Sequence, residues 1–155
     1  LAHLVDGVPD IGVIGMPALD EVFLGIKGEG ATLNGAKIQS SNQTGLGECI
    51  LYINEAEKIF RDYPEVFVSL IRTGQTRRFG YDCYPHALLA AGHVDAVVDY
   101  DLQPYDYLAL MVVIEEAGGV MTDWEGRPLN LKSDGRVLSA ATPQLHAKLL
   151  AQLGG

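Results

Sequence analysis

The sequence predicts an α/β protein, a layered α+β sandwich in which helices cover a mixed sheet. Three observations support this fold class. Segments with strand-like and helix-like patterns alternate along the chain, as they do in layered folds. Hydrophobic residues make up 48% of the 155 residues, which suffices for one domain with a core. Proline near the first turn or glycine after the last turn marks several helix-like segments, and the chain contains no repeats or linkers.

The first forty residues predict antiparallel hairpins. The Asp-Gly pair at 6–7 separates two apolar segments, and residues 11–17 form a short strand that ends at proline. Residues 21–38 alternate in polarity and contain two turns, Gly-Glu-Gly at 28–30 and Asn-Gly at 34–35. The Asn-Gly pair fits a two-residue hairpin turn, which requires positive φ.

The rest of the chain divides by the spacing of its apolar residues. Short apolar runs bounded by turn residues predict strands, and apolar residues three to four apart predict helices. The predicted strands are 49–55, 95–101, 120–129 (with a turn) and 136–142. The predicted helices are 59–72, 84–94, 104–117 and 143–153. The first of these helices contains Pro64 near its start, and the second ends at Gly92.

Charge and cysteine content exclude several functions. The net charge is −9 and the pI is near 4.7, so we expect no nucleic-acid partner, because an acidic field repels phosphate backbones. A small phosphorylated substrate remains compatible, since a divalent cation reverses the local charge. Cys49 and Cys83 form neither a disulfide framework nor a zinc motif, which indicates thiols in a reducing cytoplasm. No apolar run is long enough to span a membrane, so we expect no membrane partner.

Three carboxylates meet where the predicted strand 95–101 passes into the helix 104–117. Asp106 lies at the start of this helix, whose residues 107–114 are all apolar or aromatic, as in a buried helix. Asp99 and Asp101 are two residues apart, which places them on one face of the strand. Such carboxylates suit Mg²⁺. The alternative is that Asp106 caps the helix, worth about 1 kcal/mol, and that the other two are solvated strand-end residues.

Three segments carry a resemblance to a known family. Residues 104–126, PYDYLALMVVIEEAGGVMTDWEG, resemble the C-terminal signature of the inositol monophosphatase family of metal-dependent phosphatases. Residues 24–41, LGIKGEGATLNGAKIQSS, resemble the central hairpins of that family. Residues 77–106, RRFGYDCYPHALLAAGHVDAVVDYDLQPYD, resemble its histidinol-phosphate phosphatase branch. The likeness extends over nearly all of residues 5–153.

The resemblance implies roles for individual residues. Asp106 matches the late metal-binding aspartate of the family, which would hold Mg²⁺. Asp99 falls where the family places an acid that contacts the organic part of the substrate, and Asp82 follows Gly80 and Tyr81 in the loop that lines the substrate pocket. The amine and imidazole of histidinol would pair with these carboxylates, whereas inositol would donate hydroxyl hydrogen bonds to them.

Two arginines and two departures from the branch pattern complete this comparison. Arg77 or Arg78 would contact the phosphate, and an equally weighted alternative is a surface or structural ion pair. Tyr81 replaces a glycine that is usual in the branch, and Gln103 replaces a frequent lysine. Both replacements bear on the substrate assignment.

The metal site of the family also requires an early glutamate and an Asp-Pro-Ile-Asp-Gly-Thr loop, and neither is present in this chain. The chain also opens in an apparent strand without methionine. We therefore expect residues 1–155 to be the C-terminal portion of a single inositol monophosphatase-like fold, with the water-activating residues on another segment. We assign no catalytic residue within this chain.

These observations lead to a functional expectation with alternatives. We expect an Mg²⁺-dependent phosphate monoester hydrolase, with histidinol phosphate (histidine biosynthesis) as the favoured substrate and no activity from the 155 residues alone. Inositol 1-phosphate or a related sugar or nucleotide phosphate is the alternative within this class. A non-catalytic binding or structural lobe is the alternative from another class. By analogy with the family, we expect a homodimer.

Several other patterns favour structural roles. The glycines at 28–30 lack the lysine and the following helix of a phosphate loop and fit a hairpin turn better. His86 and His93 lie seven residues apart without a paired ligand spacing, which favours packing or exposure. Cys83 has no obvious base partner and is expected to be a buried structural thiol.

Overall fold

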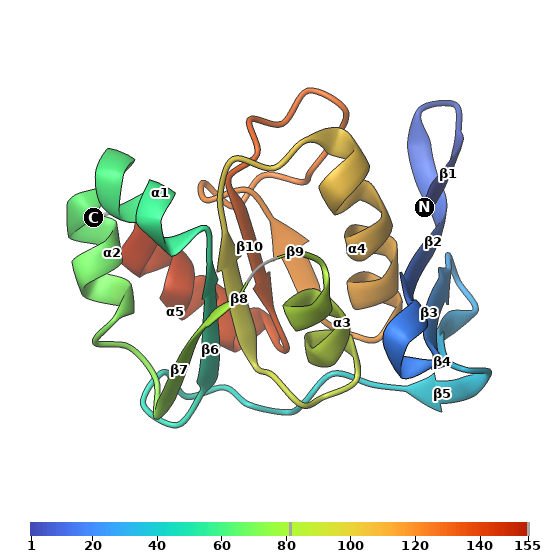
Figure 1. The fold of residues 1–155 in the computed structure, drawn as a ribbon, viewed down its shortest axis with the longest axis horizontal. Coiled ribbons are helices and arrows are strands. Elements are labelled where there is room, and N and C mark those ends of the chain that lie inside the picture. The colour runs from blue at the N-terminus through green and yellow to red at the C-terminus, as the bar shows by residue number, and fades with distance from the viewer. Residues whose placement is uncertain (81, 155) are drawn as a thin grey trace.

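An antiparallel five-stranded sheet forms one side of the molecule in the computed structural model, which describes residues 1–80 and 82–154 (Figure 1). Its strands follow chain order: β1 (Ala2–Val5), β2 (Val8–Met16), β3 (Glu21–Ile26), β4 (Gly30–Leu33) and β5 (Ala36–Ile38). A 3-10 turn, η1 (Pro17–Leu19), joins β2 to β3. The predicted hairpin turns are confirmed, because the residues at 6, 7, 34 and 35 have φ of 51°, 80°, 50° and 82°.

A second sheet of five strands is mixed, as predicted. Its spatial order is β7-β6-β8-β10-β9, with β6 (Ile50–Asn54), β7 (Thr76–Gly80), β8 (Ala96–Asp99), β9 (Val120–Thr122) and β10 (Val137–Ala140). β6 pairs in parallel with β7 and β8, whereas β10 pairs antiparallel with β8 and β9. The predicted α/β class is therefore confirmed, with the hairpins forming a separate sheet.

The helices form two further layers. Helices α3 (Tyr84–Ala90) and α4 (Pro104–Glu116) lie between the sheets, and α1 (Ala56–Asp62), α2 (Pro64–Leu70) and α5 (Pro143–Leu153) cover the outer face of the mixed sheet (Figure 1). The side chains of β8 alternate between two cores: Val97 packs in the inner core, and Ala96 and Val98 pack in the outer one. A strand buried on both faces is apolar throughout, which is why this segment shows no polar alternation.

Two glycines allow α4 to lie directly on the antiparallel sheet. Gly12 of β2 pairs with Gly25 of β3, so both face the helix at the same level. A Cβ at Gly12 would lie 2.2 Å from the carbonyl oxygen of Ala109, and one at Gly25 would lie 2.7 Å from Cα of Val113. The absence of side chains at these positions therefore sets the distance between helix and sheet.

The far end of α4 is attached to a hairpin of the same sheet. The Glu116 carboxylate accepts hydrogen bonds from the backbone N–H groups of Gly28 and Gly30, both at 2.8 Å. The stretch at 28–30 is thus a hairpin turn, as predicted, and its two amides bind a carboxylate of the chain itself. This contact fixes the C-terminal end of α4 relative to the β3–β4 turn.

Two elements differ from their predicted bounds. The predicted helix 59–72 is wrong as a single helix, because α1 and α2 are separate and Tyr63 between them has φ of −137°. The ring of Pro64 excludes the preceding residue from the helical region and removes a backbone donor. The predicted strand 95–101 ends at Asp99, and Asp101 adopts the left-handed region with φ of 65°. Asp99 and Asp101 therefore do not share a strand face, and that prediction is wrong.

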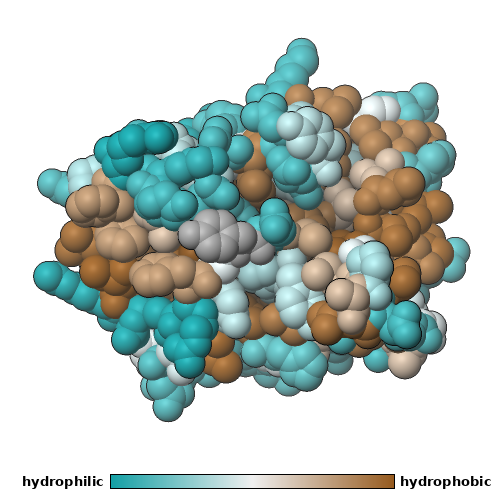
Figure 2. Space-filling view, viewed as in Figure 1, coloured by the Kyte–Doolittle hydropathy of each residue, from teal (hydrophilic) through white to brown (hydrophobic). Residues whose placement is uncertain are grey.

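Exposed apolar side chains gather at two edges of the molecule, over the antiparallel sheet and near α1 and α2 (Figure 2). At the second edge, the rings of Phe60, Phe67 and Phe79 contact one another in series, with centroid distances of 5.3 and 6.2 Å. Among the described residues, the helices are too short or too polar for any of them to cross a bilayer.

Candidate active site

A cavity of about 510 Å³ lies where β2, the loop after β8 and the first turn of α4 meet. The start of α1 and the segment after β7 complete its wall. Its described lining residues include five side-chain carboxylates and one side-chain ammonium group: Glu55, Asp82, Asp99, Asp101, Asp106 and Lys58. A concave site with this charge favours cations or ligands with a cationic group.

Asp106 lies in the first turn of α4 and at the wall of the cavity. Its Oδ2 accepts a hydrogen bond of 2.8 Å from the backbone N–H of Gln103, so the capping interpretation is confirmed for this oxygen. The positive end of the helix dipole stabilises an ionised carboxylate at this position. Because α4 is buried between the sheets, the side chain is held on a rigid support, and capping is compatible with a ligand role for the carboxylate.

The carboxylates of the cavity do not assemble into a complete metal site by themselves. Within residues 1–80 and 82–154, no group of three His, Cys, Asp or Glu side chains is placed to hold a metal ion. Asp101 instead binds Nζ of Lys58 at 2.9 Å, and Lys58 also contacts Glu55 at 2.7 Å. These hydrogen bonds to Glu55 and Asp101 raise the pKa of Lys58 and keep it charged. A role for Asp106 as one ligand of Mg²⁺ stays a prediction.

Asp99 ends β8 and is only 1% exposed. Its Oδ2 accepts a hydrogen bond from Nδ2 of Asn54 at 2.6 Å and lies 3.1 Å from Nε2 of His86, while its Oδ1 accepts a hydrogen bond from the backbone N–H of Tyr100 at 2.8 Å. Nδ1 of His86 lies 3.0 Å from Oγ of Ser139. Asp99 therefore reaches the cavity as one member of a buried polar network.

His86 is the member of this network whose role the sequence did not reveal. Packing or exposure was predicted for it, and its side chain is fully buried, but it also contacts two polar groups. An isolated histidine within the small, apolar helix 84–90 was the available signal, because a buried imidazole requires hydrogen-bond partners.

The segment after β7 holds the other predicted substrate contacts. Asp82 is exposed, lines the cavity and has φ of 59°, and its carbonyl accepts a hydrogen bond of 3.2 Å from Nδ2 of Asn54. Gly80 ends β7, where a Cβ would lie 2.7 Å from Oδ1 of Asn54. Tyr81, the third residue predicted here, lies outside the described residues.

The predicted arginines make contacts away from the cavity. The Arg77 guanidinium donates to the backbone carbonyls of Thr73, at 3.1 Å, and Gly74, and Arg78 donates to the carbonyl of Arg77 at 2.8 Å. Neither is among the described lining residues of the cavity. A role for either in phosphate binding stays a prediction.

Cys83 is half-buried at the cavity wall rather than fully buried. Burial raises the pKa of its thiol, with Asp82 as a smaller cause. The neutral thiol is therefore favoured at neutral pH, in agreement with a residue that is not a nucleophile.

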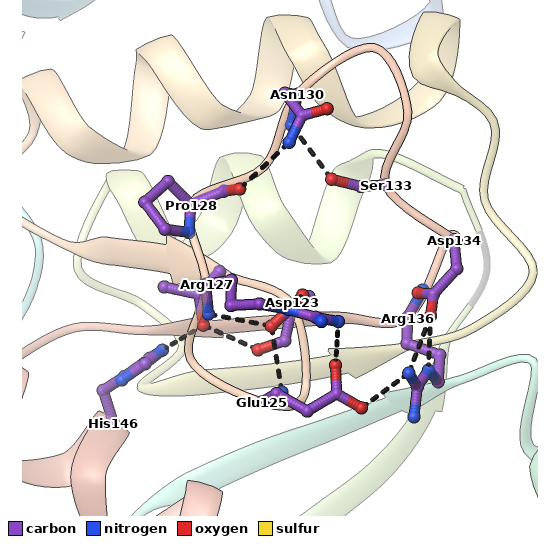
Figure 3. A network of polar contacts seen from close by, with 10 residues as sticks. Asp123, Glu125, Arg127, Pro128, Asn130, Ser133, Asp134, Arg136 and His146 are labelled. Atoms are coloured by element: carbon purple, nitrogen blue, oxygen red, sulfur yellow. Dashed lines mark hydrogen bonds and ion pairs between the residues drawn. The ribbon is translucent and has the colours of Figure 1, made fainter.

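A second polar network fixes the connection between β9 and β10 (Figure 3). Asp123 is 4% exposed, and its carboxylate pairs with Nε of Arg127 at 2.6 Å. Glu125 contacts Arg127 and also binds Nη2 of Arg136 at 2.6 Å. None of these residues is among the described lining residues of the cavity.

The two sheets, the helices between them and the acidic cavity define an α/β protein whose cavity suits cationic ligands. Residues 1–154 match the model of the inositol monophosphatase family. The chain therefore belongs to this family.

Known relatives agree with this assignment. The chain is 40% identical over 128 residues to the bifunctional phosphatase IMPL2, chloroplastic, of Arabidopsis thaliana, which covers 82% of this chain and 37% of the relative. It is 33% identical over 156 residues to a histidinol-phosphatase of Chlorobaculum parvum, which covers 99% of this chain and 59% of the relative. The chain thus spans 37% to 59% of the length of these relatives.

A solved structure supports the fold. An inositol monophosphatase from Zymomonas mobilis superimposes with a TM-score of 0.94 at 32% identity, over 99% of this chain and 61% of the other. The arrangement of two sheets around α3 and α4 is thus that of a family member.

Proposed function

We propose that a polypeptide containing this chain hydrolyses a phosphate monoester with Mg²⁺, and that Asp106 contributes one ligand to the ion. The observation that carries this proposal is the position of Asp106, on the first turn of a buried helix and at the wall of an acidic cavity. The bound ion would neutralise phosphoryl oxygens and activate water. The chain's own contribution is to orient the Asp106 carboxylate, through α4 and the amide of Gln103.

The substrate that we propose is histidinol phosphate. Its amine and imidazole offer a cationic group to Asp82 and Asp99, which line the cavity together with three further carboxylates. A relative with the name histidinol-phosphatase supports this choice. Inositol 1-phosphate is the second candidate, supported by the similarity to an inositol monophosphatase, and its hydroxyl groups would donate to the same carboxylates.

Hydrolysis on this proposal requires residues beyond those of this chain. The described residues hold no three-ligand metal group, and we assign no water-activating residue to them. We expect no turnover by the 155 residues alone and Mg²⁺-dependent turnover by a longer polypeptide. We also expect this longer polypeptide to be a homodimer and to be located in the cytoplasm. Turnover by the short chain would overturn this part of the proposal. A longer polypeptide that binds the ester without releasing phosphate would favour the non-catalytic lobe.

The test is phosphate release from histidinol phosphate and inositol 1-phosphate, measured against Mg²⁺ concentration in the longer polypeptide. Asp106→Asn should abolish measurable turnover or raise the Mg²⁺ requirement by at least an order of magnitude. Glu65→Gln is the matched control, because it removes a first-turn carboxylate from α2, away from the cavity. An Asp106→Asn variant with unchanged turnover and an unchanged Mg²⁺ requirement would falsify the metal assignment.

A further inference from the structure

We propose that His86 is a positioning residue for the substrate site: it holds the Asp99 carboxylate at the cavity wall, so that the cavity selects ligands with a cationic nitrogen over neutral polyols. His86 lies on α3 and does not line the cavity among its described residues, so it acts through Asp99. The effect of His86 on KM rests on the proposed phosphatase function. The hydrogen bond between His86 and Asp99 and the selection among ligands are testable without that function.

The chemistry of the contact fixes the direction of the hydrogen bond. On this proposal Nε2 of His86 carries the proton and donates it to Oδ2 of Asp99, 3.1 Å away, because a carboxylate group only accepts hydrogen bonds. This holds whether or not Nδ1 is protonated as well. With a neutral ring, the hydroxyl of Ser139 donates to Nδ1 over their 3.0 Å contact. Ser139 therefore orients the ring, and the ring orients the carboxylate.

The donors around Asp99 leave it little freedom. A carboxylate offers about four acceptor sites, and Oδ2 already accepts from Asn54 and His86 while Oδ1 accepts from the amide of Tyr100. On this proposal, a ligand in the cavity uses the remaining acceptor site on Oδ1 of Asp99, which is among the lining residues. Asp99 can rotate only by giving up a donor, and it is 1% exposed, so water does not replace that donor.

The network also ties the carboxylate to three strands of the mixed sheet. Asn54 ends β6, Asp99 ends β8 and Ser139 lies on β10, and His86 bridges the last two from α3. An acceptor held in this way is preorganised for one ligand geometry. Binding of a ligand therefore does not have to order the side chain, which would reduce the affinity. A cationic nitrogen gains more from a fixed charge than a hydroxyl group does. This difference is the basis of the selection.

Ligand binding to the longer polypeptide provides the first test, with histidinol and inositol as probes in an NMR titration. The wild type should bind histidinol more tightly than inositol. His86→Leu should weaken histidinol binding about tenfold, in the range of a lost charged hydrogen bond, with a smaller effect on inositol. His86→Gln places an amide N–H near the former Nε2 position and should retain most of the preference. Equal binding of the two probes by the wild type, or equal losses in the Gln and Leu variants, would overturn the proposal.

The protonation of the His86 imidazole can be measured in the wild type, so this test does not depend on whether the His86 variants fold. Long-range ¹H–¹⁵N spectra of the wild type should show a protonated Nε2 for His86, and Asp99→Asn should shift its resonance. An unprotonated Nε2 contradicts the proposed contact. His93→Leu is the control for ligand binding, because His93 is exposed and does not line the cavity among its described residues.

Kinetics in the longer polypeptide separate this proposal from the proposed function. His86→Leu should raise KM for histidinol phosphate about tenfold with kcat within twofold, and should change KM for inositol 1-phosphate less. A complete absence of turnover in the wild type rejects the phosphatase proposal, and the binding and NMR results then decide the role of His86. Equal changes of KM for both esters would reject the selective role.

Discussion

Gly12 of β2 lies so close to Ala109 of α4 that a Cβ at the glycine would be 2.2 Å from the alanine carbonyl oxygen. Backbone meets backbone at this point, and no side chain is available to move aside. The position of α4, and with it that of Asp106, therefore requires that residue 12 has no side chain.

Gly12→Ala should consequently destabilise the protein. Overpacking of this kind costs about 1–3 kcal/mol, and the free energy of unfolding from urea denaturation measures it. Gly15→Ala is the matched control on the same strand, because a Cβ there meets nothing within 4 Å. Equal stability of the two variants would contradict the close approach of α4 to the sheet.

Glu116→Gln should weaken the attachment of the β3–β4 turn to α4 and lower the stability of the protein. The carboxylate accepts two amide hydrogen bonds, and the neutral amide replaces one acceptor oxygen by a donor that faces an N–H group. The expected loss is about 1–3 kcal/mol in the free energy of unfolding. Faster hydrogen exchange at the amides of Gly28 and Gly30, ahead of the rest of the sheet, would locate the effect. Unchanged exchange at both amides would contradict it.

His146 should make stability depend on pH. Burial lowers the pKa of this histidine, which lies beside the network of Figure 3. Its Nε2 lies 2.8 Å from the hydroxyl oxygen of Thr122. The unfolded chain takes up the proton first, at about pH 6.5, so stability is fully present above that pH and is lost as the pH falls towards the lower folded pKa. His146→Gln keeps a donor and removes the titration. Thermal unfolding between pH 7.5 and 5 should therefore vary less in this variant than in the wild type.

Lys58→Met should strengthen the binding of cationic ligands. Lys58 supplies the ammonium group among the described lining residues of the cavity, where it pairs with Glu55 and Asp101. Its removal leaves these carboxylates without their cation, and we expect histidinol to bind a few-fold more tightly at low salt, with the gain screened at high salt. Lys37→Met, on the exposed strand β5, is the control. Weaker binding in Lys58→Met would show that the ammonium orients the site instead.

The fold was predictable where short-range chemistry determines it. The Asp-Gly and Asn-Gly turns require positive φ, and Pro104 and Gly118 mark the ends of α4, so these elements lie where the sequence places them. The break at Pro64 depends on the residue before the proline, and a helical apolar spacing on both sides concealed it. The early end of β8 was not predictable from polarity, because Asp101 leaves the strand to pair with Lys58, which is distant in sequence.

The site was predictable in part for the same reason. Residues that line the cavity from one continuous segment, Asp99 to Asp106, were recognisable together from their order in the chain. The partners of Asp99 come from β6, α3 and β10, and only the fold brings Asn54, His86 and Ser139 together. The binding roles of Asp82, Asp99 and Asp106 all stay predictions.

Helix α4 carries an acid near each end, with Asp106 at the cavity and Glu116 at a hairpin turn. The thirteen residues span roughly 20 Å, at 1.5 Å per residue. Because residues 107–110 and 112–114 of the helix are buried, a displacement of one end moves the other end as well. The position of the Asp106 carboxylate at the cavity thus depends partly on the hydrogen bonds of Glu116 to the β3–β4 turn, at the opposite end of α4.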